Sequence, residues 1–163
     1  MNKQFLIFFG IGIVVIAALL YFSFATTKNN HLELRGKILK VRTGVLDENS
    51  SAAVVDFRVA NPSDIPFVVR EVTATLMEAN GASEDGMMIS KSDFAQLLAY
   101  NKFLGKEYNG GLAIRDLIAP HTTVDRMVAI QFQQPASALD KAKALKLVVQ
   151  DMDGPEWTTE YRF

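Results

Sequence analysis

The pattern of hydrophobic and polar positions begins with one long apolar run. Residues 5–25 are apolar apart from Ser23, and no charged residue interrupts them. About 20 residues of α-helix rise ~30 Å, which matches the hydrocarbon core of a membrane. Tyr21 and Phe22 lie near the end of the run, where aromatic side chains meet the membrane interface. We therefore predict a transmembrane helix within residues 1–27, which contacts membrane lipid through residues 5–25.

Two forms of this segment remain open. The first form is an uncleaved signal anchor. The second form is a cleaved signal peptide, which is suggested by the small residues Ser23 and Ala25 at positions that a signal peptidase recognises. The apolar run is long for a signal peptide, which favours the anchor. In both forms the rest of the chain lies outside the cytoplasm, in a periplasmic or extracellular compartment.

The orientation meets one opposing signal. Five basic residues follow the apolar run, and the positive-inside rule would keep such charges in the cytoplasm. They are Lys28, Arg35, Lys37, Lys40 and Arg42. Four of them fall within the first predicted strand of a folded domain, so we expect a single-pass protein with a cytoplasmic N-terminus and an extracytoplasmic domain.

After a polar linker at 28–31, residues 32–163 show the two-residue alternation of β-strands. The alternation changes phase between Ile38 and Leu39, which predicts a β-bulge there. We predict strands at 32–45, 53–59, 67–78, near 112–117, and at 123–133, 145–149 and 157–163. About seven strands separated by turns are typical of an antiparallel β-sandwich.

One stretch has helical periodicity instead. Ser90 and Asp93 have the spacing of a capping box, and Gly105 favours a helix end. The spacing predicts an amphipathic helix over 92–104 that covers one end of the sandwich. Its apolar positions are Phe94, Leu97, Leu98 and Leu104. Core packing is the favoured use of this face, and docking of a partner or lipid is the alternative.

The segment 53–76 resembles a known family. An apolar strand over 54–59 is followed by Asn61-Pro62-Ser63, then Ile65-Pro66-Phe67, then a strand rich in Val and Thr. This order resembles the LEA type 2 (water-stress) domain and is similar to the bacterial domains named for an FxLYD motif. The resemblance covers roughly residues 32–135. It implies an immunoglobulin- or fibronectin-III-like sandwich with extracytoplasmic placement, and it implies no catalytic residues.

Composition and charge narrow the classes of function. Lys3 is the one charged residue of 1–27, so the remainder carries 16 basic and 18 acidic residues. A nearly neutral domain lacks the basic surface of a nucleic-acid-binding protein. The chain has no cysteine, which excludes disulfides, thiol nucleophiles and thiolate metal sites. A domain of ~135 residues is large enough to fold on its hydrophobic core alone.

The motifs of common active sites are missing from the sequence. The two histidines, His31 and His121, have no neighbouring metal-ligand pattern. No glycine-rich phosphate loop and no Gly-x-Ser-x-Gly elbow occur. Asp151-x-Asp153-Gly154 predicts a β-turn, because Gly154 follows too early for a calcium loop. We therefore predict no catalytic, cofactor-binding or metal-binding residues.

The sequence predicts a membrane-tethered, non-enzymatic β-sandwich that interacts with another protein of the cell envelope. The candidate surfaces are the 80–111 excursion and the loops at 61–64 and 119–123. The candidate partner-binding residues are Phe94, Leu97, Leu98, Leu104, Asn61 and His121. Two alternatives are a stress-protective envelope protein, as the family resemblance implies, and the handling of lipid or an apolar ligand beneath the helix as a lid.

Overall fold

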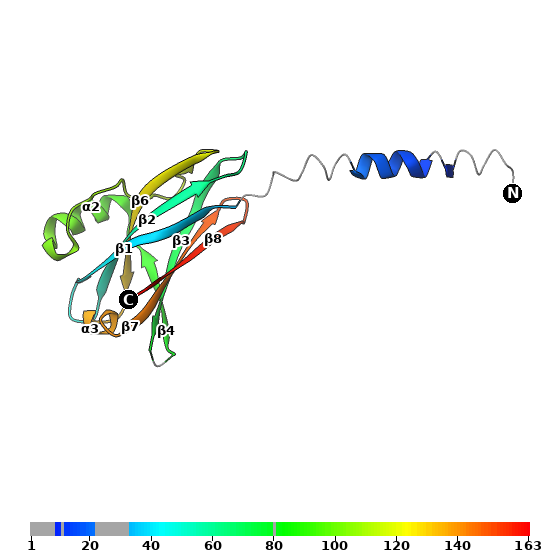
Figure 1. The fold of residues 1–163 in the computed structure, drawn as a ribbon. Helices are drawn as coiled ribbons and strands as arrows, with labels where there is room; N and C mark the ends of the chain where they lie inside the picture. Colours follow the sequence, from blue (N-terminus) through cyan, green and yellow to red (C-terminus); the bar gives the residue numbers. More distant parts are fainter. Residues whose placement is uncertain (1–8, 11, 22–32, 80) are drawn as a thin grey trace. The chain divides into compact units, whose positions relative to one another are not determined.

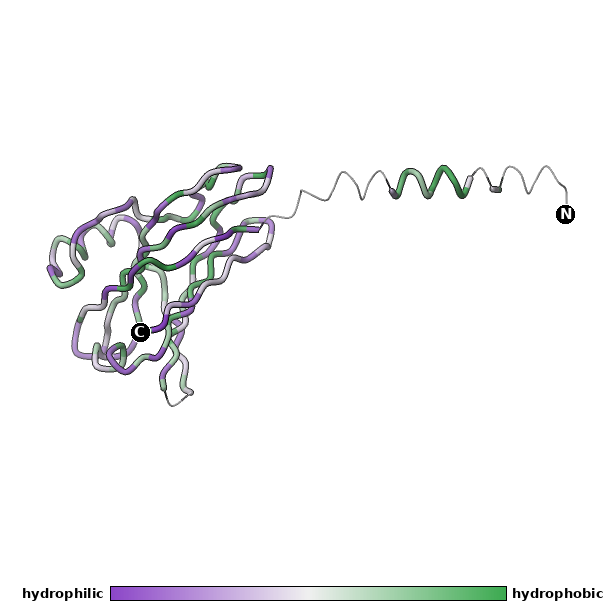
Figure 2. Tube along the Cα trace, viewed as in Figure 1, coloured by the Kyte–Doolittle hydropathy of each residue, from purple (hydrophilic) through white to green (hydrophobic). Residues whose placement is uncertain are grey.

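The computed structural model describes residues 9–10, 12–21, 33–79 and 81–163 (Figure 1). The chain divides into two compact units, Met1–His31 and Leu32–Phe163. In the first unit residues 9–10 and 12–21 are helical, and this helical stretch is hydrophobic along most of its length (Figure 2).

None of the helices in the described ranges combines the length and the apolarity that a membrane crossing requires. The predicted anchor at 1–27 lies partly outside these ranges, and the predicted linker at 28–31 lies wholly outside them. Both stay predictions.

The second unit is mainly β, as predicted, with eight antiparallel strands and a few short helices. The strands are β1 (Arg35–Val45), β2 (Ser51–Asn61), β3 (Phe67–Glu78), β4 (Ser83–Met88), β5 (Leu117–Ile118), β6 (Thr122–Phe132), β7 (Ala142–Asp151) and β8 (Glu156–Arg162). The helices are α2 (Lys91–Tyr100), the 3-10 helix η1 (Lys102–Leu104) and α3 (Ala136–Leu139).

The strands form one nearly closed sheet. Their order is β1-β2-β6-β4-β3-β7-β8, and β5 pairs with β3 beside this path. Because β4 pairs with both β3 and β6, it joins the two layers of the sandwich. The end strands β1 and β8 approach each other at Gly36, where an added Cβ would meet the Trp157 ring at 2.8 Å.

Several predictions based on local signals are confirmed. The strand at 67–78 has the bounds of β3. The bulge in β1 is seen as a register shift between Ile38 and Lys40. The turn at 151–154 is closed by the Gly154 N–H, which donates to the Asp151 carbonyl at 3.1 Å.

Three predictions of elements were wrong. The sequence pattern missed β4, whose first three residues are polar and whose fourth is Gly86. A Cβ on Gly86 would lie 2.3 Å from the Ile130 side chain, so the close approach of β4 to β6 requires glycine. The strand predicted near 112–117 is reduced to the two-residue β5 and an isolated bridge between Gly111 and Met127. The strand predicted at 145–149 begins earlier, because β7 starts at Ala142, just after the short helix α3.

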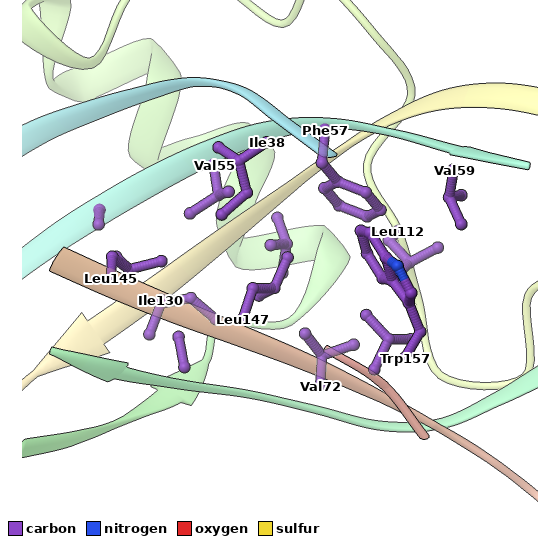
Figure 3. Close-up of a cluster of buried hydrophobic side chains, with 14 of the residues drawn as sticks. Ile38, Val55, Phe57, Val59, Val72, Leu112, Ile130, Leu145, Leu147 and Trp157 are labelled. Carbon is purple, nitrogen blue, oxygen red and sulfur yellow. The ribbon is translucent and has the colours of Figure 1, made fainter. Parts of the chain in front are cut away.

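The main core lies between the two layers of the sandwich, and Figure 3 shows part of it. Phe57 of β2 packs against Trp157 of β8, with 5.6 Å between their ring centres. A second cluster lies on the outer face of β2 and β6, where Ala52, Val54, Met127 and Ala129 are buried beneath Phe94 and Leu104. The predicted helix at 92–104 is therefore two helices, α2 and η1, and they cover this outer face rather than one end of the sandwich.

Candidate functional site

The helical excursion begins with the predicted cap. The Ser90 hydroxyl accepts a hydrogen bond from the Asp93 N–H at 3.2 Å and donates to the Asp93 carboxylate at 2.8 Å. At the other end of α2, Asn101 donates its N–H to the Leu97 carbonyl at 2.8 Å. The Asn101 side chain accepts from the Phe103 N–H at 3.1 Å and donates to the Val45 carbonyl at 2.9 Å. One asparagine thus ends α2, starts η1 and ties both to β1.

A buried ion pair fixes the segment that follows η1. The Arg42 guanidinium lies 3.0 Å from the Asp56 carboxylate, and their side chains are only 9% and 8% exposed. Arg42 also donates to the Leu104 carbonyl, and to the Lys106 carbonyl at 3.2 Å. Its guanidinium carbon lies 5.3 Å from the centre of the Tyr108 ring, within the range of a cation–π contact. Residues 104–108 are therefore held on the outer face of β1 and β2.

Between this excursion and the end of β1 lies an open apolar groove of about 790 Å³. Its walls are residues 43–46, the α2–η1 segment and α3. Tyr100 and Phe103 line the groove and are 88% and 92% exposed. Large aromatic side chains with so little protein around them are typical of surfaces that bind a partner. Lys102 and Asp140 add one charge of each sign to the groove.

Comparisons with known proteins find only distant structural likenesses. No protein-family model and no curated protein matches the sequence. An uncharacterized β-sandwich protein from Clostridium difficile superposes with a TM-score of 0.45 at 10% identity, over 80% of this chain and 86% of that chain. The archaellum periplasmic stator proteins FlaF and FlaG from Sulfolobus acidocaldarius superpose with a TM-score of 0.36 at 13% identity, over 83% and 95%. The Iho670 flagellar-like filament gives a TM-score of 0.40 at 7% identity, over 99% and 98%.

These likenesses all have TM-scores of 0.45 or less. They assign no family, so the resemblance to the LEA type 2 domain stays a prediction.

The structure brings four of the six candidate residues together on the excursion. Phe94 and Leu104 are buried in the second cluster, so their side chains hold α2 and η1 on the sheet. Leu97 and Leu98 are half-buried against the same cluster, and Leu97 also lines the groove. Binding through these residues stays a prediction, and Leu97 is the one that faces the groove.

The other two candidates lie at the opposite end of the strands. Asn61 is buried and its amide donates to the Ile65 carbonyl at 2.8 Å and to the Ile118 carbonyl at 3.1 Å, so it closes the β2–β3 turn. His121 is exposed, and its ring nitrogen lies 2.8 Å from the Asp64 carboxylate. Neither residue lines the groove.

The aromatic rim of the groove was missed by the sequence analysis. Tyr100 and Phe103 are not among the apolar positions of the predicted helix. The signal that could have identified them was a pair of aromatic residues on either side of the polar residues Asn101 and Lys102. Within residues 9–10, 12–21, 33–79 and 81–163, no cluster of three side chains could hold a metal ion.

The turn beside the groove contains a carboxylate with a perturbed pKa. The Ser50 hydroxyl donates to the Asp47 carboxylate at 2.6 Å, and the Asn49 N–H donates to it at 2.8 Å. These hydrogen bonds, that of Ser50 first, hold the pKa of Asp47 below its ordinary value of 3.8. Since the pKa is lowered by folding, the resulting stabilisation is present above the unfolded pKa of ~3.9 and is lost as the pH falls through the folded pKa.

We expect the Ser50→Ala variant to move the pKa of Asp47 back toward its ordinary value. An NMR titration of the side-chain carboxyl carbons measures this directly. Ser137→Ala removes an exposed serine hydroxyl elsewhere and is the matched control. An unchanged pKa of Asp47 in Ser50→Ala would contradict the assigned cause.

Proposed function

We propose that the chain is a membrane-tethered, non-enzymatic, extracytoplasmic module whose groove binds an apolar segment of another envelope protein. The observation that carries this proposal is the pair of exposed aromatic side chains, Tyr100 and Phe103, at the rim of an open groove. Aromatic side chains supply much of the binding energy of protein interfaces, because they bury large areas and have few rotamers.

We also propose that the domain is an immunoglobulin- or fibronectin-III-like sandwich. Two groups of neighbouring strands support this assignment, β1-β2-β6 in one layer and β4-β3-β7-β8 in the other. This is the arrangement in which strands A, B and E pack against C, F and G. In this view β4 is the extra strand that reaches across to β6.

The groove is organised before any partner arrives. Asn101 ties η1 to the Val45 carbonyl, and Arg42 holds the carbonyls of Leu104 and Lys106. Binding to a preformed surface loses little conformational entropy, which favours affinity. The partner we propose presents aliphatic or aromatic side chains to the groove and polar groups to Lys102 and Asp140.

One observation favours a second candidate function. A groove of about 790 Å³ also matches the volume of sites that bind small apolar ligands. Native mass spectrometry of the purified chain distinguishes the two, because a retained lipid or other small molecule would favour ligand handling.

The test of the proposal uses the full-length chain in its native membrane. A photo-crosslinking residue placed at Phe103 should trap one reproducible protein, whereas the same residue at the exposed Thr158 of β8, which does not line the groove, should not. With the trapped protein purified, we expect Phe103→Ser to weaken its binding at least about tenfold.

The matched control for this variant is Met87→Ser, which removes another exposed apolar side chain, that of Met87 in β4. It should bind like the wild type. Wild-type affinity in Phe103→Ser would remove the groove from the interaction, and trapping at Thr158 alone would place the binding surface elsewhere.

A further inference from the structure

The end of the domain opposite the groove carries a second exposed apolar surface. The chain enters the domain at this end, since Arg35 is paired with Ala60 near the end of β2. The β2–β3 turn, β5 and the turn at 151–155 lie at the same end, because Asn61 bonds the Ile118 carbonyl and β7 ends beside Val69. We call this the proximal end.

Three apolar side chains form a row across the proximal end. Val68 is in register with Leu117 of β5, and the Met152 N–H donates to the Val68 carbonyl at 3.0 Å. Residues in register on neighbouring strands present their side chains on the same face. Leu117 is 56% exposed, Met152 is 50% exposed and Val68 is half-buried. We call Val68, Leu117 and Met152 the proximal row.

A turn carries a further apolar residue and a cation next to this row. The Asp116 N–H donates to the Ala113 carbonyl at 3.1 Å, which places Ile114 and Arg115 in the turn between them. Ile114 is 60% exposed, and Arg115 has a φ of 70°, a conformation that glycine usually occupies. The Arg115 N–H donates to the Val69 carbonyl at 2.7 Å, so β3 holds the turn against the row.

The acidic side chains nearest the row are engaged within the domain. The Asp116 carboxylate accepts from the Ala113 N–H at 2.9 Å. The buried Asp151 carboxylate accepts from the Val68 N–H at 2.6 Å and from the Asp153 N–H at 2.8 Å.

The two guanidinium groups beside the row are free to bind an external anion. Arg70 and Arg115 flank Val69, and both are exposed. Within the described part of the domain the ion pairs of arginine are made by Arg42, Arg58 and Arg162. The exposed carboxylates at this end are those of Glu33, Asp64, Glu71, Asp153 and Glu156. Asp64 lies 2.8 Å from the His121 ring, and Glu156 accepts a hydrogen bond from the Gln150 amide at 3.3 Å.

We propose that the proximal end rests on an anionic lipid surface. Leu117, Met152 and Ile114 enter the boundary between headgroups and acyl chains, and Arg70 and Arg115 bind lipid phosphates. Apolar side chains with cations beside them favour binding to such a surface. Arginine suits phosphate because its guanidinium donates two parallel hydrogen bonds.

We choose a lipid surface as the binding partner of the proximal end because a short segment connects the apolar run to β1. This inference rests on the proposed membrane tether, because only nine residues, 26–34, separate the apolar run from β1. Nine residues span at most about 30 Å. The tether therefore keeps the proximal row at high effective concentration near the membrane, so that a weak contact suffices.

The test uses the absence of cysteine from the chain. Single cysteines at Leu117, Met152 and Asn49 carry an environment-sensitive dye in the full-length protein, reconstituted in vesicles of phosphatidylcholine with phosphatidylglycerol. We expect a blue shift and quenching by brominated lipid at Leu117 and Met152, with neither effect at Asn49. In the double variant Arg70→Ser/Arg115→Ser, the ratio of lipid-inserted to water-exposed dye at Leu117 and Met152 should fall about 30-fold. Vesicles of phosphatidylcholine alone should show the same weakening.

Flotation of the vesicles separates this inference from the tether on which it rests. If the chain floats with the vesicles but the labels at Leu117 and Met152 stay as water-exposed as the label at Asn49, the lipid contact is overturned and the tether stands. If the chain does not float, both are overturned. Emission of Trp157 checks that each variant is folded.

Discussion

Replacing Asp56 with alanine is expected to lower the free energy of unfolding of the domain by about 4 kcal/mol. The change leaves the Arg42 guanidinium buried without the carboxylate that lies 3.0 Å away in the wild type. A buried charge without its counter-charge is strongly destabilising because its desolvation is no longer compensated. Urea unfolding measured by fluorescence gives the value, since Trp157 is the single tryptophan and is buried in the core.

Two control variants isolate the cause. Arg42→Met combined with Asp56→Leu removes both charges and should recover much of the stability. Asp125→Ala removes a carboxylate that pairs with the exposed Arg58, and it should shift the urea midpoint far less because water screens that pair. If Asp56→Ala and Asp125→Ala shift the midpoint equally, the buried pair does not hold the excursion as we infer.

Gly36→Ala is expected to lower the free energy of unfolding by about 3 kcal/mol. The new Cβ would lie 2.1 Å from the Arg58 carbonyl oxygen and 2.8 Å from the Trp157 ring. Because a backbone oxygen cannot rotate away as a side chain can, β1 itself must move from β2 and β8. Thermal unfolding measures the loss, and a change in Trp157 emission would report the movement.

The matched control is Gly110→Ala. Nothing lies within 4 Å of a Cβ added to Gly110, so this variant should unfold at nearly the wild-type temperature. Equal unfolding temperatures for the two variants would show that β1 and β8 do not need their close approach.

Local signals in the sequence predicted the parts of the fold that depend on neighbouring residues. The Ser90 cap, the bulge after Ile38 and the bounds of β3 each follow from a few adjacent side chains. Pairing between distant segments was not predictable in this way. β4 has three polar residues followed by Gly86, so it lacks the apolar alternation of a strand. It becomes a strand because β3 and β6 supply its hydrogen-bond partners.

The candidate site also depends on contacts between segments that are distant in the sequence, which local signals do not predict. The strand at 53–59 was predicted from a two-residue alternation, which implies one buried face. β2 is buried on both faces for most of its length, because the helical excursion covers its outer face. Phe94 and Leu104 were correctly placed in the helical excursion as apolar positions, and they form the cover. The groove was missed because Tyr100 and Phe103 become its rim only through the contact of Asn101 with β1, which is distant in sequence.

The course of β1 has a mechanical consequence. This strand of 11 residues runs from the end where the chain enters the domain to the wall of the groove, a span of about 35 Å. A partner that pulls on the groove against the proposed tether would stretch β1 along its own axis. The load would then act in shear across the ten register pairs that join β1 to β2, rather than peeling them apart one at a time. With the proposed tether and partner in place, such a strand would transmit force between them while the domain stays folded.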